Sequence, residues 1–448
     1  MDTPREQPPS AVPVTATQGG DVRSRWAWTE PAVWTERMLT ALEMGVKGGV
    51  WFSLIDKVFA ERNLRVAAAK VAANHGAPGI DHVTVETFLD DLDTNVAKLT
   101  AAGRGGSYEP QAIRRVYIPK PGSHEPRPLG IPTVRDRVVQ AAVRHVMEPI
   151  FEREFATHSY GFRPGRGCKD ALRRVDGLLK QGYGYVVDAD LKSYFDSIPH
   201  DRLMERLRER IADQRLLGLI ESFLKAGILD GLHEWEPEAG APQGAVLSPL
   251  LSNIYLNPLD HQLAAQGFQM VRYADDFVIL CRSQAEAEQA LALVRQWCEA
   301  EGLTLHPTKT QIVDVRVKGF DFLGYHFQTT RRGRLTRWPR KKSMQKLQDA
   351  IRRKTRRTNG HSLACIIANV NRTLLGWFGY FKHSGRPTFV GVDSWVRMRL
   401  RSILRQRAGR QGRGRGRDHQ RWPKAFFAQP GYFSLETAFA TVCQPPRG

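Results

Sequence analysis

Two adjacent aspartates, Asp275 and Asp276, have the clearest potential for chemistry in this chain. They lie between the apolar, strand-forming stretches 269–273 and 277–280, a pattern typical of a β-hairpin with a carboxylate pair at its turn. Two like charges side by side repel, and a cation or a proton relieves that repulsion. A hard divalent ion such as Mg²⁺ suits these oxygen ligands. For the Asp-Asp pair alone, an acidic and solvated turn is the simpler alternative.

A third carboxylate follows another candidate strand upstream. Asp190 ends an apolar stretch, and Phe195 and Asp196 come next, in what should be a turn into a helix. If that strand lies beside the later hairpin, Asp190 and Asp275 point to one place. Two metal ions roughly 3.5–4 Å apart, held by such carboxylates, can activate an attacking hydroxyl and stabilise a leaving pyrophosphate. Asp190 alone could instead be a helix N-cap, and Asp196 is interpreted as a cap or structural residue rather than a metal ligand.

Two further stretches offer groups that suit a nucleotide. Residues 240–257 open with a Pro/Gly turn and enter an apolar helix, so backbone N–H groups there, together with Gln243, could face a sugar-phosphate. Lys120 and Arg127 flank a Pro/Gly loop, and the two cations could neutralise the β and γ phosphates of a nucleoside triphosphate. Each of them could equally be a solvated surface cation.

The positive charge is concentrated in the C-terminal third of the chain. The net charge is +20, and residues 331–417 hold 25 Lys and Arg against 2 Asp and Glu, so the remaining chain is close to neutral. A region this basic is typical of a polyanion binder. Nucleic acid is favoured over an anionic membrane, because apolar and basic residues interleave without a continuous amphipathic pattern.

Composition limits the class of protein. With 448 residues, 42% of them hydrophobic, the chain is long enough for two or three domains with real cores. The five cysteines are scattered without a Cys-x-x-Cys pair, which argues against a disulfide framework or a structural zinc site and fits a reducing compartment. The sequence shows neither a signal peptide nor an apolar run of membrane-spanning length. We therefore expect a cytoplasmic protein with no membrane partner, nucleoid-associated when it is bound to DNA.

The elements that must position these residues can be read from the apolar periodicity. Helices are predicted over residues 31–100, 135–156, 200–228, 284–301 and 341–357. Extended segments are predicted over residues 108–135, 183–190 and 269–280, around 304–305 and around 320–327. The mixture predicts an α+β chain.

The order of the motifs resembles a reverse transcriptase palm. Asp190 with Phe195-Asp196 is followed by Ala-Pro-Gln-Gly at 241–244, Tyr-Ala-Asp-Asp at 273–276 and Gly-Leu-Thr-Leu-His-Pro-Thr-Lys at 302–309. Over about residues 35–440 the chain is similar to bacterial group II intron-encoded reverse transcriptase/maturases. Further stretches that carry the resemblance are 74–81, 127–132, 158–166, 320–325, 375–381, 422–427 and 433–435.

The resemblance implies a right-hand polymerase followed by a basic helical maturase domain. The polymerase would have fingers, a palm with an antiparallel sheet, and a helical thumb. The implied parts are a flexible lead over 1–30, fingers and palm over 31–328, a thumb/maturase region that binds RNA over 329–385, and a basic DNA/RNA-binding segment over 386–448.

The same resemblance implies roles for particular residues. Asp190, Asp275 and Asp276 would be the catalytic aspartates that bind two Mg²⁺ ions. Phe195 would be the steric gate against a ribose 2′-OH, and Lys309 would protonate the leaving pyrophosphate. The implied dNTP contacts are Lys120, Arg127, Leu191, Phe195, Gln243 and Lys309, and the implied primer grip is Phe322, Leu323 and Gly324. The implied RNA-binding residues are Arg340, Lys341, Lys342, Lys346, Arg352, Arg353, Arg356 and Arg357.

The implied function is RNA-directed DNA synthesis, together with binding of a group II intron RNA to assist splicing and retrotransposition. The partners would be that RNA, an RNA template with a DNA primer, target DNA and dNTPs. No Cys/His-rich segment follows the maturase-like region, so the chain resembles the endonuclease-lacking branch and would need an existing 3′-OH. A non-enzymatic RNA-binding maturase, and a domesticated reverse transcriptase in defence or DNA repair, remain alternatives.

The charge distribution makes a prediction about RNA binding. Replacing several arginines within residues 331–357 by glutamine should weaken binding and flatten its dependence on salt, because fewer counterions are released per complex. Filter-binding titrations at several salt concentrations measure both quantities. An unaltered salt slope would place the phosphate contacts elsewhere.

Overall fold

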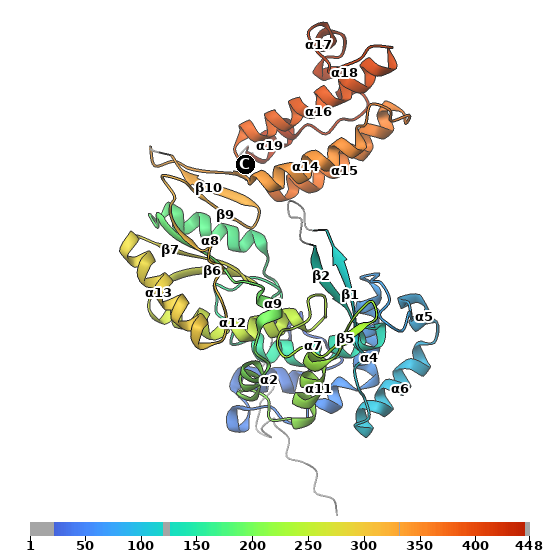
Figure 1. Cartoon of the computed structure of the whole chain (residues 1–448), viewed down its shortest axis with the longest axis vertical. Helices are drawn as coiled ribbons and strands as arrows, with labels where there is room; N and C mark the ends of the chain where they lie inside the picture. The colour runs from blue at the N-terminus through green and yellow to red at the C-terminus, as the bar shows by residue number, and fades with distance from the viewer. Residues whose placement is uncertain (1–21, 120–125, 331, 444–448) are drawn as a thin grey trace, which may run out of the picture. The chain divides into compact units, whose positions relative to one another are not determined.

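The computed structural model describes residues 22–119, 126–330 and 332–443 (Figure 1). The chain divides into two compact units. The first comprises Met1–Leu178 and Val187–Ile312, and the second comprises Leu179–Val186 and Val313–Gly448. Most of the lead expected over residues 1–30 lies outside the described residues. In the described part of the chain, no helix combines the length and the apolar composition needed to cross a bilayer.

The N-terminal part of the first unit is helical, as predicted. Its helices are α1 (Val22–Arg25), α2 (Glu36–Met44), η1 (Lys47–Gly49), α3 (Ile55–Val58), α4 (Glu61–Ala72), α5 (Val85–Asp90), α6 (Leu92–Gly105) and α7 (Val134–Glu152). Threonine side chains at Thr35, Thr84 and Thr133 accept backbone N–H groups at the starts of α2, α5 and α7, and such caps satisfy donors that a helix leaves unpaired. Helix α7 is buried along most of its length and packs against α3 and α4.

A four-stranded sheet follows in the first unit, in the order β2-β1-β4-β5. It contains β1 (Ile113–Ile118), β2 (Arg127–Ile131), β4 (Ile228–Asp230) and β5 (His233–Trp235). Strands β1 and β2 form an antiparallel pair, whereas β1 and β4 run parallel. The extended segments predicted before residue 120 and after residue 126 are therefore confirmed as β1 and β2.

The predicted Asp-Asp hairpin belongs to a second sheet, in the order β6-β7-β3-β8. Its strands are β3 (Tyr185–Asp190), β6 (Gln269–Tyr273), β7 (Asp276–Cys281) and β8 (Gln311–Asp314). Tyr273 pairs with Asp276, so Ala274 and Asp275 form the turn between β6 and β7. Helices α12 (Ser248–Ala265) and α13 (Gln284–Ala300) contact β6 and β7, which explains why β7 is buried beyond its first residue.

Two of the predicted element boundaries are wrong. The helix expected over 200–228 is two helices, α10 (His200–Arg208) and α11 (Gln214–Lys225). Asp213 separates them, because its carboxylate accepts the N–H groups of Leu54 and Ile55 as well as those at the start of α11. The segment expected around 304–305 makes only an isolated bridge between Leu191 and Leu305, and the strand is β8 instead.

Shorter helices complete the first unit, and the second unit has its own sheet and core. The remaining helices of the first unit are α8 (Cys168–Lys180) and α9 (Tyr194–Ser197). The second unit contains β9 (Phe320–Phe322), β10 (Tyr325–Thr329), β11 (Leu335–Pro339), α14 (Lys341–Lys354), α15 (Leu363–Phe381), α16 (Arg386–Arg407), α17 (Arg417–Arg421), α18 (Lys424–Ala428) and α19 (Leu435–Cys443). Its core includes Ile351, Val370, Phe378 and Val396.

A buried aspartate ties the C-terminal segment to the core of the second unit. Asp393 on α16 is fully buried, and its carboxylate accepts the hydroxyls of Tyr432 at 2.9 Å and Ser434 at 2.8 Å. It also accepts the backbone N–H groups of Leu435 and Glu436, each at 3.1 Å. The Asp393 carboxylate therefore pairs backbone N–H groups that the start of α19 would otherwise leave without an acceptor.

Removing this carboxylate should destabilise the second unit. We expect Asp393→Ala to lower the free energy of unfolding by about 3 kcal/mol, because several buried donors lose their acceptor. Asp349→Ala is the matched control, since Asp349 is half-exposed and pairs only with neighbours on its own helix; it should change stability by less than about 0.5 kcal/mol. Chemical denaturation of both variants measures the two changes in the free energy of unfolding. Equal changes would contradict the stabilising role given to Asp393.

Candidate active site

The turn between β6 and β7 presents Asp275 beside a second carboxylate. Asp275 is half-buried. Burial raises its pKa above the ordinary value, the negative charge of Asp190 raises it further, and Arg127 and Arg272 act in the opposite direction. Asp190 and Asp275 are therefore close enough to repel each other, although 84 positions separate them in the sequence. The sequence placed the two residues at one site on the condition that the strand ending in Asp190 lies in the sheet of the hairpin, and the order β6-β7-β3-β8 meets that condition.

A lysine neutralises Asp190 in this structure. Lys309 Nζ donates to Asp190 Oδ2 at 2.7 Å. Backbone contacts bring the lysine there: the N–H of His306 donates to the carbonyl of Asp190 at 2.7 Å, and the N–H of Lys192 donates to Thr304 at 2.8 Å. Lys309 therefore lies at the carboxylates through a direct ion pair that the sequence did not predict.

The donor chemistry of the site fits a hard divalent cation. Asp190 and Asp275 offer carboxylate oxygens whose mutual repulsion a cation would relieve. Asp276 starts β7, and its side chain is exposed. Among the described residues, no three His, Cys, Asp or Glu side chains converge in a metal-holding group. The structure therefore brings two of the three predicted aspartates into electrostatic contact without assembling all three into one ligand set.

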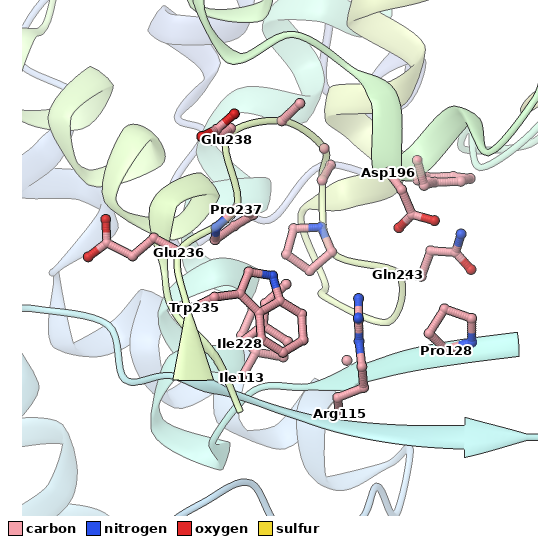
Figure 2. Close-up of a pocket in the computed structure, with 16 residues that line it drawn as sticks. Ile113, Arg115, Pro128, Asp196, Ile228, Trp235, Glu236, Pro237, Glu238 and Gln243 are labelled. Atoms are coloured by element: carbon pink, nitrogen blue, oxygen red, sulfur yellow. The ribbon is translucent and has the colours of Figure 1, made fainter. Parts of the chain in front are cut away.

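A pocket of about 470 Å³ lies next to Phe195. Its walls come from β1, β2, the segment 235–243 and residues 195–196 of α9. Figure 2 shows Arg115 pointing between Trp235 and Gln243. Phe195 is half-buried and contacts the ring of Tyr194, with 5.5 Å between the ring centroids. The hydroxyl of Tyr194 donates to Ser252 at 2.8 Å, so Phe195 rests on an anchored neighbour.

Gln243 joins the loop that lines the pocket to strand β2. Arg127 Nε donates to Gln243 Oε1 at 2.7 Å, and the N–H of Gly130 donates to the backbone carbonyl of Gln243, also at 2.7 Å. The loop comes closest to β2 at Gly244, where a Cβ would lie 2.4 Å from the carbonyl oxygen of Gly130. Gly244 also has a φ of +109°. Glycine is needed here on both counts.

Of the predicted dNTP contacts, the structure brings Phe195, Gln243 and Arg127 to one region. Leu191 is buried, with 6% of its surface exposed, and pairs with Leu305. Lys120 lies outside the described residues.

Three residues near the site were not found from the sequence: Arg115, Trp235 and Arg272. The guanidinium of Arg115 lies 4.9 Å from the centre of the Trp235 ring, in a favourable cation–π arrangement. No local pattern indicates this contact, because it arises from the parallel pairing of β1 with β4 and the antiparallel pairing of β4 with β5. Arg272 could have drawn notice as a charged residue within an apolar strand, where it is completely buried.

In the second unit, the residues predicted as the primer grip form a turn held by two helices. Phe322 is buried, and Leu323 and Gly324 both have positive φ angles. The hydroxyl of Tyr380 donates to the Leu323 carbonyl at 2.7 Å, and the hydroxyl of Ser343 donates to the Gly324 carbonyl at 3.0 Å. The turn is therefore fixed against α14 and α15.

The predicted RNA-binding residues lie at the start of α14 and around its C-terminal end. Seven of them are exposed: Lys341, Lys342, Lys346, Arg352, Arg353, Arg356 and Arg357. Arg340 is half-buried. In the same unit, Phe378 and Phe381 are buried and Trp377 packs against the core. These aromatic residues are core residues rather than free stacking platforms for bases.

Comparison with known proteins agrees with this geometry. Residues 118–327 match the family described as reverse transcriptase (RNA-dependent DNA polymerase), and residues 344–422 match the group II intron maturase-specific domain. Protein YkfC of Escherichia coli K12 is 35% identical over 345 residues, which are 67% of this chain and 85% of that protein. The chain belongs to the group II intron-encoded reverse transcriptase/maturase family.

Other relatives are longer than this chain. The group II intron-encoded protein LtrA of Lactococcus lactis is 40% identical over 200 residues, 44% of this chain and 32% of LtrA. An uncharacterized 91 kDa protein in the cob intron of Schizosaccharomyces pombe is 32% identical over 319 residues, 58% of this chain and 39% of that protein. The predicted α+β fold, with a reverse transcriptase domain followed by a maturase domain, is confirmed, and so is the enzyme class of RNA-directed DNA polymerase.

The position of Phe195 on the pocket wall makes a prediction about sugar selectivity. Phe195→Ala should raise incorporation of ribonucleotides relative to deoxyribonucleotides about tenfold or more, because a bulky ring no longer opposes the 2′-OH. Phe52→Ala is the matched control, since Phe52 does not line the pocket. Single-nucleotide primer extension with rNTP and dNTP measures the ratio, and an unchanged ratio would remove Phe195 from this role.

Proposed function

We propose that this chain copies RNA into DNA at the Asp190–Asp275 site and uses its second unit to bind its own group II intron RNA, which it assists in splicing and retrotransposition. The observation that carries the proposal is the sheet order β6-β7-β3-β8, which places the strand that ends in Asp190 beside the hairpin that carries Asp275. Two half-buried carboxylates from distant motifs come together there, and the negative charge of Asp190 raises the pKa of Asp275. A structural acidic turn has no need of such an arrangement.

Each residue near the pocket has a task in nucleotidyl transfer. Asp190 and Asp275, with Asp276 on the same hairpin, would hold divalent ions, for which Mg²⁺ is the natural choice. When bound, such ions activate the primer hydroxyl and stabilise the leaving pyrophosphate. Arg127, with Lys120, would hold the triphosphate, and Gln243 is kept in place by its bond to Arg127. Positioning and charge neutralisation account for most of the catalysis of phosphoryl transfer.

Lys309 would act on the leaving group. Its ammonium carries a proton at Nζ and stays at the site by pairing with Asp190 Oδ2. With Asp190 engaged in holding a divalent ion, Lys309 would be free to donate its Nζ proton to the leaving pyrophosphate.

The second unit supplies a surface suited to folded RNA. Basic side chains are exposed at both ends of α14, and residues 344–422 match the maturase-specific domain. Neutralising phosphates with such side chains releases counterions and gives affinity for RNA without reading bases directly. Intron RNA, an RNA template with its DNA primer, and target DNA are the partners that this combination suits.

A purely RNA-binding maturase is the second candidate. The dense positive charge of residues 331–417 favours it, because that region could stabilise intron RNA without catalysis. The Asp190–Asp275 pair argues against it as the whole function, since a binder of polyanions gains nothing from a cluster of negative charge.

One substitution distinguishes the two candidates. Asp275→Asn should reduce Mg²⁺-dependent dNTP incorporation on an RNA template by more than about 100-fold, because a charge placed for the transition state is lost. Splicing of the cognate intron should persist, since the second unit is unchanged. Asp93→Asn is the control, because the Asp93 side chain is 88% exposed. Full polymerase activity in the Asp275 variant would refute the site, and no activity in the unmodified protein would favour the pure maturase.

A further inference from the structure

Residues 158–163, with the sequence His-Ser-Tyr-Gly-Phe-Arg, have no role in the function proposed so far. They run along the outer edge of strand β6. The N–H of Arg272 donates to the His158 carbonyl at 3.0 Å, and the N–H of Tyr160 donates to the Arg272 carbonyl at 2.8 Å. Ser159 and Arg272 thus form a parallel bridge. The stretch lies against the two residues that precede the catalytic turn.

The Arg272 side chain reaches the turn from inside the protein. Its Nη1 donates to the carbonyl of Ala274 at 3.0 Å and to Asn253 Oδ1 at 2.8 Å. Its Nε donates to Asp260 Oδ1 at 2.8 Å, and its Nη2 bonds the same carboxylate. Arg272 and Asp260 are 0% exposed. The planar guanidinium therefore spans helix α12 and the backbone of the turn with fixed geometry.

Asn253 and Gly161 complete the arrangement. Asn253 Nδ2 donates to the Gly161 carbonyl at 2.8 Å, so α12 holds the 158–163 stretch as well as Arg272. A Cβ on Gly161 would lie 2.2 Å from the backbone nitrogen of Ala274, which leaves no space for any side chain. The backbone of residues 158–163 therefore packs directly against the backbone of the β6–β7 turn.

The 158–163 stretch is also fixed on its far side. Arg163 Nη2 pairs with Glu152 Oε1 at 2.7 Å, and Arg163 Nη1 donates to the carbonyls of Ala156 at 2.6 Å and Ser159 at 2.8 Å. The Arg163 side chain is 2% exposed. Gly161 is therefore held against the turn by a buried ion pair rather than by a flexible loop.

The turn itself needs such support. Ala274 has a φ of +59°, a left-handed conformation that residues other than glycine avoid. Backbone in this region persists where the surrounding structure over-determines it, and such strain is concentrated at functional sites. Ala274 is contacted by Arg272 at its carbonyl and faces Gly161 at its nitrogen, on the two sides of the strained residue.

We propose that Arg272, Asp260, Asn253 and Gly161 are positioning residues that form a turn clamp, which holds Ala274 left-handed and thereby sets the position of the Asp275 carboxylate. The inference rests on the proposed polymerase function for its catalytic consequence. A buried Arg–Asp pair adds little net stability compared with apolar side chains of similar volume. The benefit of this pair is the fixed direction of its Nη1 donor toward the turn.

The first test is Gly161→Ala. The matched control is Gly167→Ala, six residues further along the chain, where an added Cβ meets nothing within 4 Å. The full-length protein is assayed on oligo(dT)-primed poly(rA) with Mg²⁺ and dTTP. We expect kcat to fall about 100-fold, as displacement of a reacting group by about 1 Å can cause, while KM for dTTP stays within about threefold. Turnover of Gly161→Ala equal to that of the control would overturn the proposal.

The second test separates positioning from folding. The double variant Arg272→Met with Asp260→Leu replaces the buried pair by apolar side chains, which proteins often tolerate without loss of stability. We expect a melting temperature near that of the unmodified protein and a loss of kcat similar to that of Gly161→Ala. A stable double variant with normal turnover would refute the clamp.

Hydrogen–deuterium exchange provides a measurement that does not depend on activity. Peptides covering residues 272–277 should exchange faster in Gly161→Ala than in Gly167→Ala, because the turn loses its support. Unchanged exchange would overturn the clamp even if the unmodified protein proved inactive. Inactivity of the unmodified protein together with faster exchange in Gly161→Ala would instead reject the polymerase function and leave the clamp supported.

Discussion

The placement of Asp190 beside Asp275 is the constraint on which the candidate site depends. Folding must bring two negative charges together in a half-buried place, and burial makes each charge more costly than it would be in water. The sheet order β6-β7-β3-β8 places β7 beside the strand that ends in Asp190. Lys309 offsets part of the charge directly, and Arg127 and Arg272 lower the pKa of Asp275 against the combined effect of burial and Asp190. Positive side chains of the chain itself thus offset the negative charge that a bound cation would otherwise have to neutralise alone.

Backbone contacts, more than side chains, hold the parts of this site in place. Gly244 and Gly161 both stand where a Cβ would collide with another segment's backbone, and each joins a motif to a neighbouring strand. The loop with Gln243 is fastened to β2, and the 158–163 stretch is fastened to β6. Close backbone contact leaves these segments little freedom to move. Such rigidity suits phosphoryl transfer, because most of its rate enhancement comes from positioning the reacting groups.

The second unit combines a well-packed core with a basic surface. Its helices pack around an apolar core, and Asp393 secures the start of α19 from within. With its core satisfied internally, the unit can leave basic side chains at the surface, where α14 presents them at both ends. In the proposed function, catalysis and RNA binding would be carried by separate parts of the chain. A change at Asp275 would then leave the proposed RNA-binding surface unaltered.

The sequence by itself determined the hairpin around Asp275, the helices before residue 100, the family and the location of the positive charge. These features are local: apolar periodicity, turn residues and motif order are visible within short windows. It failed where a distant partner decides the outcome. Asp213 ends a helical run because it accepts N–H groups near residue 54. Arg115 meets Trp235 only because β4 pairs with β1 on one side and with β5 on the other. The tertiary structure alone decided that Arg272 lies inside the protein and grips the turn, because a buried charge is tolerated only where the fold supplies its partners.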